Sequence, residues 1–321
     1  MTLLLTGASG FVGRHVQKMY SQAMMECVPL DAGGEPVDLR DAAAVRQAVR
    51  GVMERDAPEA VLHLAAQSHV PTSLADPADT FAVNFTGTLH LLQALAESGF
   101  RGRLLYVSSG AVYGRVPGDS LPVTETFPCR PRDPYAVSKV AAEALCYQWS
   151  VTGPFEIVMA RPFNHTGPGQ SREFAIPGFA AQLAGMRAGR RAPVLEAGDL
   201  SVTRDFCDVR DVVRAYGLLL AQGRNGEAYN VCSGVERKLS DIVDTLARLA
   251  GLSPTIETKA GRLRPAEQPR MCGSPHKLKR DTGWTAETPW EDTLRDLLNH
   301  DQPDAGLLNP DPLKPTEGGG S

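Results

Sequence analysis

A tyrosine and a lysine four residues apart are the clearest candidates for chemistry in this sequence of 321 residues. Tyr135 and Lys139 begin and end the segment YAVSK, which follows Pro134 and is predicted to be helical. Residues i and i+4 share one face of a helix, so the Lys139 ammonium can lie near the Tyr135 phenol. We expect this charge to lower the pKa of Tyr135 towards neutrality and make it a general acid or base. The alternative is an ordinary solvated helix face, which such a pair usually marks.

Ser109 is a second candidate. The pair Ser108-Ser109 follows a predicted strand at Leu104–Val107. The carboxyl ends of parallel strands face the ligand crevice of an α/β sheet, so Ser109 can hydrogen-bond a substrate oxygen there.

A glycine-rich segment near the N-terminus has the pattern G-x-x-G-x-x-G. It lies between a predicted strand at Thr2–Leu5 and a predicted helix at Phe11–Ser21. Glycines let the backbone approach a pyrophosphate, and the helix N-terminus offers free N–H groups and a partial positive charge. A glycine-rich turn without a ligand is the alternative, but the strand–loop–helix context favours a dinucleotide. The expected cofactor contacts are Gly7, Gly10, Phe11, Val12 and Gly13.

Asp31 ends a predicted second strand at Cys27–Asp31. A carboxylate there can bind the adenosine ribose diol and would repel a 2'-phosphate, so we favour NAD over NADP. Two alternatives remain: Asp31 belongs to the turn DAGG, or Arg40 reads a phosphate. His63 alone is interpreted as a packed or hydrogen-bonded residue. Further expected cofactor contacts are Asp38 and Leu39 near the adenine, and Leu64, Ala65 and Ala66 after the third strand.

Alternating strands and helices must position these residues. The predicted strands of the first half are Thr2–Leu5, Cys27–Asp31, Ala60–Leu64, Leu104–Val107 and Phe155–Ala160. The predicted helices are Phe11–Ser21, Leu39–Arg55, Asp76–Ser98 and Pro134–Ser150. Strand–helix alternation at this spacing predicts an α/β fold with a doubly wound parallel sheet of the Rossmann type.

The alternation of strands and helices stops after Arg161, where Pro162–Gln170 is predicted to be a loop. Later helices are predicted at Glu173–Ala188, Asp208–Ala221, Leu239–Ala250 and Pro289–Asn299, and strands at Ala228–Val231 and Thr255–Glu257. We expect a cofactor-binding domain from 1–161 plus about 205–231, and a smaller C-terminal substrate domain from about 162–204 plus 232–300. Residues 301–321 are expected to be a disordered tail.

Composition excludes several classes of function. The formal charge of -4 gives no basic excess for nucleic acid, and no polybasic tract suggests an anionic membrane surface. No uninterrupted apolar run is long enough to span a bilayer. The six cysteines show neither C-x-x-C spacing nor a Cys/His cluster, so we expect no metal site. Reduced thiols place the chain in the cytoplasm.

The motifs together resemble the extended short-chain dehydrogenases/reductases that act on nucleotide sugars. They follow the family's order along almost the whole chain: TGASGFVG at 6–13, HLAA at 63–66, NxxGT at 84–88, SSGAVYG at 108–114, YAVSK at 135–139, ARPFNHTGPGQ at 160–170, RDFCDVRDV at 204–212, YNVCSG at 229–234 and RPAE at 264–267. The resemblance implies catalytic roles for Ser109, Tyr135 and Lys139, with Asn84 supporting their geometry and Lys139 holding the nicotinamide ribose. It also assigns His165 to the cofactor.

The resemblance further implies a nucleotide-binding set made of Asn164, Arg204, Arg264 and Glu267, beside Ser109 at the sugar. An arginine fork suits a diphosphate, and Glu267 suits a ribose diol. For Arg204 and Arg264 alone, a surface ion pair is the alternative.

Within that family, the chain is most similar to reductases of GDP-4-keto-6-deoxy-D-mannose, which make GDP-D-rhamnose. The 4,6-dehydratases carry acidic residues just after the catalytic hydroxyl, where this chain has Gly110 and Ala111. The expected reaction is therefore reduction of the C4 ketone of a GDP-sugar with NADH or NADPH. A 4-epimerase that keeps its cofactor bound, or a cofactor sensor without catalysis, is the alternative. The family often dimerises through two helices, here at about 76–98 and 134–150, so we expect a homodimer unless those apolar faces pack on the sheet.

Overall fold

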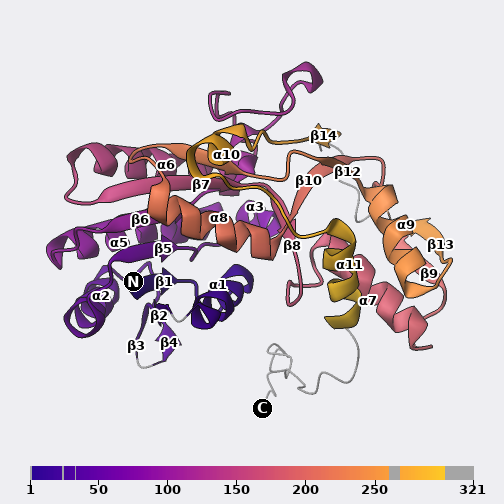
Figure 1. Ribbon diagram of the computed structural model, residues 1–321, viewed down its shortest axis with the longest axis horizontal. Helices are drawn as coiled ribbons and strands as arrows, with labels where there is room; N and C mark the ends of the chain where they lie inside the picture. Colours follow the sequence, from indigo (N-terminus) through magenta and orange to yellow (C-terminus); the bar gives the residue numbers. More distant parts are fainter. Residues whose placement is uncertain (1, 24, 33, 260–267, 301–321) are drawn as a thin grey trace, which may run out of the picture.

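The computed structural model describes residues 2–23, 25–32, 34–259 and 268–300 (Figure 1). A six-stranded parallel sheet forms its centre, in the order β11-β7-β6-β5-β1-β2. The strands are β1 (Thr2–Thr6), β2 (Glu26–Pro29), β5 (Ala60–His63), β6 (Arg103–Val107), β7 (Glu156–Pro162) and β11 (Ala228–Val231). The chain runs from β1 to β2 on one side and then crosses to β5 on the other. This reversal opens a crevice at the carboxyl ends of β1 and β5, where α/β sheets bind ligands.

Helices cover both faces of this sheet, as the doubly wound prediction requires. Successive side chains of a strand point to opposite faces. Leu3 and Leu5 of β1 therefore pack with α1 (Phe11–Gln22) and α8 (Val209–Gln222). Leu4 packs on the other face, in a second apolar cluster that includes residues of α2 (Ala42–Asp56), α5 (Gly87–Glu97) and α6 (Pro134–Thr152).

A third apolar cluster lies to one side of the sheet (Figure 1). It is formed by α7 (Ala175–Arg187), α9 (Leu239–Ala250) and α11 (Trp290–His300), together with β9 (Val194–Ala197), which pairs with β13 (Thr255–Thr258). Between this cluster and the sheet, β10 (Thr203–Asp208) pairs with β12 (Glu236–Lys238), β14 (Arg270–Met271) and β8 (Asn164–Thr166).

Several expected elements differ in the structure. The single helix predicted over Asp76–Ser98 is divided into α4 (Pro77–Phe81), a π-helical turn η1 (Ala82–Thr86) and α5, and α3 (Val70–Ala75) precedes them. The predicted loop Pro162–Gln170 contains β8, because its residues gain backbone partners from β10. The helix predicted from Leu39 begins at Ala42, since the Asp41 carboxylate accepts from the N–H groups of Ala43 and Ala44 and caps it there.

Short elements complete the fold. They are the antiparallel pair β3 (Asp31–Ala32) and β4 (Glu35–Pro36), the 3₁₀ turns η2 (Gly110–Tyr113) and η3 (Gly118–Ser120), and the helix α10 (His276–Thr282).

Candidate active site

The start of α6 determines where Tyr135 and Lys139 lie. The Asp133 carboxylate accepts a hydrogen bond from the Ala136 N–H at 2.8 Å and caps the helix. Pro134 takes the first helical position, where its missing N–H costs nothing. Tyr135 therefore falls in the first turn, and Lys139 lies one turn later on the same face.

The structure places Ser109 near Tyr135, just beyond the carboxyl end of β6. The Ser109 hydroxyl is near enough to the Tyr135 phenol to lower the pKa of that phenol by hydrogen bonding. The same hydroxyl oxygen accepts from the Ala111 N–H at 3.1 Å, because Ser109 caps η2. Two hydroxyl groups thus converge on one point, as a carbonyl oxygen that gains negative charge requires.

Lys139 is buried, and its Nζ donates to the carbonyl oxygen of Val107 at 2.8 Å. The ammonium lies 5.9 Å from the ring centroid of Tyr135 and 5.1 Å from that of Tyr106. Burial lowers the pKa of Lys139 to about 8.

The prediction that Lys139 lowers the pKa of Tyr135 is wrong for this structure. Burial of the phenol raises the pKa of Tyr135, and the hydrogen bond with Ser109 offsets only part of that effect. The ammonium serves the Val107 carbonyl rather than the phenol oxygen. Tyr135 consequently keeps its proton at neutral pH, which is the state of a proton donor.

Asn84 ties the catalytic helix to the end of β5. The π-helical turn places it in the interior, where only 1% of its surface is exposed. Its Oδ1 accepts from the Gln67 N–H at 2.8 Å, and its Nδ2 donates to the Gln67 carbonyl at 2.9 Å and to Ser138 Oγ at 3.0 Å. Ser138 in turn donates to the Tyr135 carbonyl at 2.7 Å. The Asn84 amide therefore positions the turn of α6 that carries Tyr135 and Lys139.

The glycine loop after β1 leaves no room for side chains. Gly7 has a positive φ of 71°, and a Cβ there would lie 2.8 Å from the backbone nitrogen of Ala65. A Cβ on Gly13 would lie 2.2 Å from the Gly7 carbonyl oxygen. Gly10 caps α1 without a side chain, so the first N–H groups of the helix stay available. These features fit a dinucleotide pyrophosphate, with Phe11 and Val12 in the first turn and Leu64 to Ala66 facing the loop.

His63 belongs to a buried chain of hydrogen bonds between the ends of β1 and β5. Its Nδ1 lies 2.7 Å from Thr6 Oγ1, and its Nε2 lies 3.0 Å from Thr88 Oγ1. Burial lowers the pKa of His63 to about 3, and the Lys139 charge acts in the same direction. The interpretation of His63 as a hydrogen-bonded packing residue is confirmed.

Asp31 does not end β2, which stops at Pro29. The strand pairing with β1 ends there, and Asp31 opens the short β3–β4 hairpin instead. Its Oδ1 accepts from the Gly34 N–H at 3.2 Å, so it also has the turn function weighed from the sequence. It nevertheless lies two residues beyond the strand next to β1.

The neighbouring residues of the expected adenine site are already paired. Arg40 donates to the Asp38 carboxylate at 2.8 Å and to Asp79 at 2.6 Å, and its hydrogen bonds lower the pKa of Asp38. Leu39 is buried, and its carbonyl lies 2.8 Å from Nδ1 of His90.

Two of the four residues expected to bind the nucleotide, Asn164 and Arg204, lie on the small sheet formed by β8, β10, β12 and β14. Asn164 of β8 is exposed and pairs with Phe206 of β10, two residues beyond Arg204. Arg204 is half-buried, and its Nη1 donates to the Thr203 carbonyl at 2.7 Å. Arg264 and Glu267 lie outside the described residues.

His165 connects this sheet to the glycine loop. Its ring stacks on Phe11, with centroids 6.2 Å apart and planes inclined by 8°. Arg14 and His15 of α1 also lie 2.9 Å from the carbonyl oxygens of Gly169 and Pro168. The segment after β8 is therefore held against the start of α1.

A buried ion pair behind the catalytic helix was not predicted. Arg161, at the end of β7, donates to the Glu143 carboxylate of α6 at 2.6 Å, and both side chains are nearly inaccessible. Arg161 also donates to the Tyr113 hydroxyl at 3.0 Å, and that hydroxyl donates to Asn230 at 2.6 Å. The sequence shows that Glu143 and Arg161 are charged, but it does not show that they pair. A single charged residue does not indicate which residue elsewhere in the fold it will contact.

Phe163 closes the position that follows Ser109. A Cβ on Gly110 would lie 3.1 Å from the Phe163 ring, so an acidic side chain has no space there without movement of the ring. The carboxylates on the neighbouring elements are engaged: Glu143 with Arg161, and Glu125 with the Asn230 N–H at 2.8 Å.

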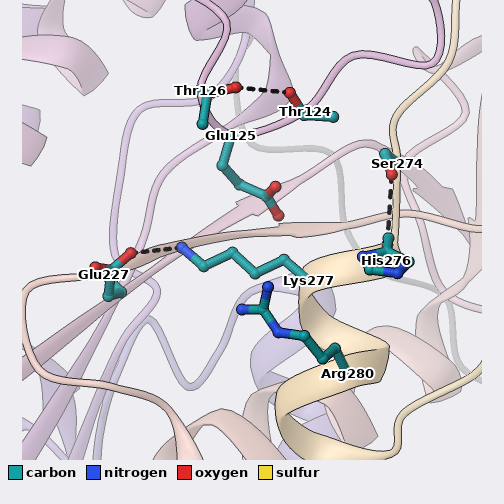
Figure 2. A pocket seen from close by; sticks show the side chains of 8 residues that line it. All are labelled: Thr124, Glu125, Thr126, Glu227, Ser274, His276, Lys277 and Arg280. Atoms are coloured by element: carbon teal, nitrogen blue, oxygen red, sulfur yellow. Dashed lines mark hydrogen bonds and ion pairs between the residues drawn. The ribbon is translucent and has the colours of Figure 1, made fainter.

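A cavity of about 400 Å³ is lined by Glu125 but not by Ser109, Tyr135 or Lys139 (Figure 2). Its charged groups are already paired, since Lys277 donates to Glu227 at 2.6 Å and Arg280 to Asp281 at 2.6 Å. It forms a junction between α10, the chain before β11 and a loop. Its lining residues are Thr124, Glu125, Thr126, Glu227, Ser274, His276, Lys277 and Arg280.

The described residues contain no group of three or more His, Cys, Asp or Glu side chains arranged to hold a metal ion. Within the same ranges, no helix is both long and apolar enough to cross a bilayer.

Comparison with known proteins places this chain in a family. Residues 34–297 match the family model described as GDP-mannose 4,6-dehydratase. The chain is 45% identical over 297 residues to the GDP-6-deoxy-D-mannose reductase of Pseudomonas aeruginosa, covering 92% of this chain and 96% of that protein.

Solved structures show the same architecture. The structure of RMD from Pseudomonas aeruginosa complexed with NADPH superposes with a TM-score of 0.88 at 43% identity, covering 94% of this chain and 98% of that one. The UDP-glucose 4-epimerase of Thermus thermophilus in complex with NAD gives a TM-score of 0.80 at 30% identity, covering 94% of this chain and 99% of that one.

Proposed function

The chain belongs to the GDP-mannose 4,6-dehydratase family of extended short-chain dehydrogenases/reductases, and we propose that it is a reductase within that family. It reduces the C4 ketone of GDP-4-keto-6-deoxy-D-mannose with NADH or NADPH and releases GDP-D-rhamnose. The relative named a GDP-6-deoxy-D-mannose reductase, 45% identical over most of both chains, supports this assignment.

One observation carries the choice of reductase over dehydratase. Ser109 lies near the Tyr135 phenol, while Gly110 lies against Phe163 in the place where a dehydratase needs an acid. Elimination of water requires a base for the C5 proton and an acid for the departing hydroxyl. A ketone reduction requires one proton donor besides the hydride, and Tyr135 is that donor.

The residues divide the work of the reduction. When bound, the reduced cofactor supplies the hydride that reaches C4 of the sugar. Ser109 and Tyr135 donate hydrogen bonds to the carbonyl oxygen as negative charge develops on it. Tyr135 then transfers its phenolic proton to that oxygen, completing the alcohol. Lys139 would hold the nicotinamide ribose, and its charge, 5.9 Å from the centre of the Tyr135 ring, would stabilise the phenolate at that distance without a direct hydrogen bond.

The cofactor binds across the carboxyl ends of β1 and β5. The N-terminus of α1, with Gly7, Gly10 and Gly13, would hold its pyrophosphate. Asp31 would accept hydrogen bonds from the adenosine ribose, which would make NADH the preferred form. His165 adds to the cofactor site because its ring packs on Phe11, in the first turn of α1.

The GDP moiety binds on the side of the small sheet that carries Asn164 and Arg204, with Arg264 and Glu267 completing the nucleotide site. Arginines suit a diphosphate because their planar forks donate paired hydrogen bonds to its oxygens.

The protein acts as a homodimer in the cytoplasm. Apolar side chains of α6 remain exposed at helical spacing, namely Val137, Ala144, Tyr147 and Val151. Phe81, Phe85 and Leu89 form a half-buried apolar row on α4, η1 and α5. Two such rows per subunit suit a four-helix interface between copies. All six cysteines are free thiols, which supports a reducing compartment.

A coupled assay tests the proposed reaction. GDP-mannose is converted by a 4,6-dehydratase, and this protein is added with NADH or with NADPH. We expect one cofactor oxidised for each keto sugar consumed, with GDP-D-rhamnose identified by NMR. Sugar conversion without cofactor oxidation would instead indicate an epimerase, and cofactor binding without turnover would indicate a sensor.

A further inference from the structure

A second arginine lies directly opposite Arg204 on the small sheet. In the antiparallel pairing of β10 with β12, Arg204 is the register partner of Arg237. Directly opposed residues point to the same face, with Cβ atoms about 5 Å apart. Two guanidinium groups therefore project from one face at adjacent places, an arrangement that disfavours folding unless something compensates their charge.

The neighbouring carboxylates make no hydrogen bond or ion pair with Arg237, although the charge of Asp205 acts on it from the opposite face and partly offsets its burial. Asp205 and Glu236 occupy the next positions on the two strands, so their side chains belong to the opposite face. Asp205 accepts from Ser233 and from the Gly234 N–H at 2.9 Å, and Glu236 accepts from Arg270 at 2.6 Å.

Arg237 is oriented but makes no hydrogen bond with another residue in the part of the chain that the structure describes. Its guanidinium carbon lies 4.8 Å from the ring centroid of Trp290, and that ring stacks on Phe206 at 6.0 Å. Its Nε is buried without any hydrogen-bond partner. The stacking fixes the plane of the guanidinium and leaves donors free, which is how arginine is presented to an anion.

We propose that Arg237 is a nucleotide-binding residue that grips the diphosphate of the GDP-sugar together with Arg204. Asn164 pairs with Phe206 on the next strand, so the three strands place Asn164, Arg204 and Arg237 on one face. An anion between the two guanidinium groups removes their repulsion and gives the free donors of Arg237 an acceptor. This inference rests on the proposed function, which supplies the diphosphate.

Calorimetric titration of the whole protein with GDP, GMP and guanosine tests the inference. Arg237→Met should weaken GDP binding by about 10- to 100-fold, the range for one charge-assisted hydrogen-bonding group. Guanosine binding should not change, and Arg237→Lys should keep part of the GDP affinity. Lys238→Met is the matched control, because it removes the same charge from the next position on the opposite face and should change GDP affinity less than about 2-fold.

Steady-state kinetics add a second readout. Arg237→Met should raise KM for the keto sugar with little change in kcat, because uniform binding is lost while the reacting groups stay in place.

Three outcomes would overturn the inference. Unchanged GDP affinity with a lower Tm would assign Arg237 to packing on Trp290 alone. Equal losses for GDP and guanosine would assign it to the base. A wild-type protein that binds no GDP would refute the proposed function itself, and is distinguished because the wild type is measured first.

Discussion

Burial moves the pKa values of Tyr135 and Lys139 in opposite directions. It raises the pKa of Tyr135 and lowers that of Lys139 to about 8. A neutral phenol beside a mostly charged ammonium is the protonation state that a reduction needs at its start. The motif spacing identified the two residues, but their pKa values depend on burial and on the Val107 carbonyl, which only the folded chain supplies.

Tyr135→Phe tests the proton donor. We expect turnover to fall by about 10²- to 10⁴-fold, the usual loss when a general acid is removed. Binding of the reduced cofactor, followed by fluorescence, should stay within error of wild type because the ring and Lys139 remain. Near-normal reduction of the keto sugar by this variant would show that another group supplies the proton.

Asp31 tests cofactor choice. We expect the wild type to use NADH better than NADPH, because the carboxylate accepts hydrogen bonds from a ribose diol and repels a phosphate. Arg40, the nearby cation weighed as a phosphate ligand, is paired with Asp38 and Asp79. Asp31→Ala should narrow the ratio of kcat/KM values for the two cofactors.

The control for this change is Asp119→Ala, which removes an acidic residue in η3, a different part of the chain from the β3–β4 hairpin. A wild-type preference for NADPH would contradict the assignment and indicate that Arg40 leaves its carboxylates to bind the phosphate. The structure of the NADPH complex from Pseudomonas aeruginosa makes this comparison informative.

Hydrogen bonds through His63 join the ends of β1 and β5 to α5, and the donor and the acceptor of each bond can be assigned. Thr88 Oγ1 donates to the Asn84 carbonyl at 2.7 Å, so it must accept from Nε2 of His63. Nδ1 of His63 then accepts from Thr6, whose oxygen accepts from the Ala65 N–H at 3.1 Å. Burial keeps His63 neutral, and this series of hydrogen bonds then supports the floor of the crevice between β1 and β5.

His63→Gln tests this connection through acid stability. The folded-state pKa of His63 is lowered to about 3, while an unfolded histidine titrates near 6.5. Between these values the unfolded state binds the extra proton, so acid reduces the free energy of unfolding. We expect that decrease, measured by urea unfolding from pH 6 to pH 4, to be shallower in His63→Gln by roughly 1.4 kcal/mol per pH unit.

His276→Gln is the matched control, because His276 is exposed on α10 and its replacement should leave the wild-type slope unchanged. An identical slope for His63→Gln would mean that His63 is protonated in the folded protein over this range.

The elements predicted well are those whose ends are marked in the sequence by glycine or proline. The glycine loop set the junction of β1 and α1, and Pro134 set the start of α6. The sequence does not show where the helix predicted at Asp76–Ser98 is divided. The π-helical turn there buries Asn84, and it depends on contacts with Gln67 and Ser138. The three-residue β8 and β12 were also missed, since their pairing with β10 is long-range.

At the scale of the molecule, the described residues pack in four apolar clusters. Two cover the faces of the parallel sheet, the third joins α7, α9 and α11, and the fourth gathers residues of η2 with Phe163 and Cys232. Leu278 and Trp284 fall in the segment assigned to the substrate domain, yet they pack into the first cluster with α8. We propose that the cofactor and substrate domains divide as the sequence suggested, except that the region of α10 belongs with the cofactor domain.

The proposed dimer makes a prediction for the exposed face of α6. Tyr147 and Val151 are 58% and 69% exposed, and an acidic side chain at each would face its copies across the interface. The double change Tyr147→Glu with Val151→Glu should convert a dimer to a monomer in light scattering. Ile256→Glu, an exposed apolar position on β13, is the control that should stay dimeric. A monomeric wild type would contradict the dimer.

In the proposed reaction, hydride passes from the cofactor to C4 of a GDP-linked keto sugar. Its most direct test uses NADH deuterated at both C4 positions of the nicotinamide, with GDP-4-keto-6-deoxy-D-mannose and the wild-type protein. We predict one deuterium at C4 of the product hexose for each cofactor oxidised, read by NMR. A product with hydrogen at C4, or sugar conversion without cofactor oxidation, would contradict this proposal.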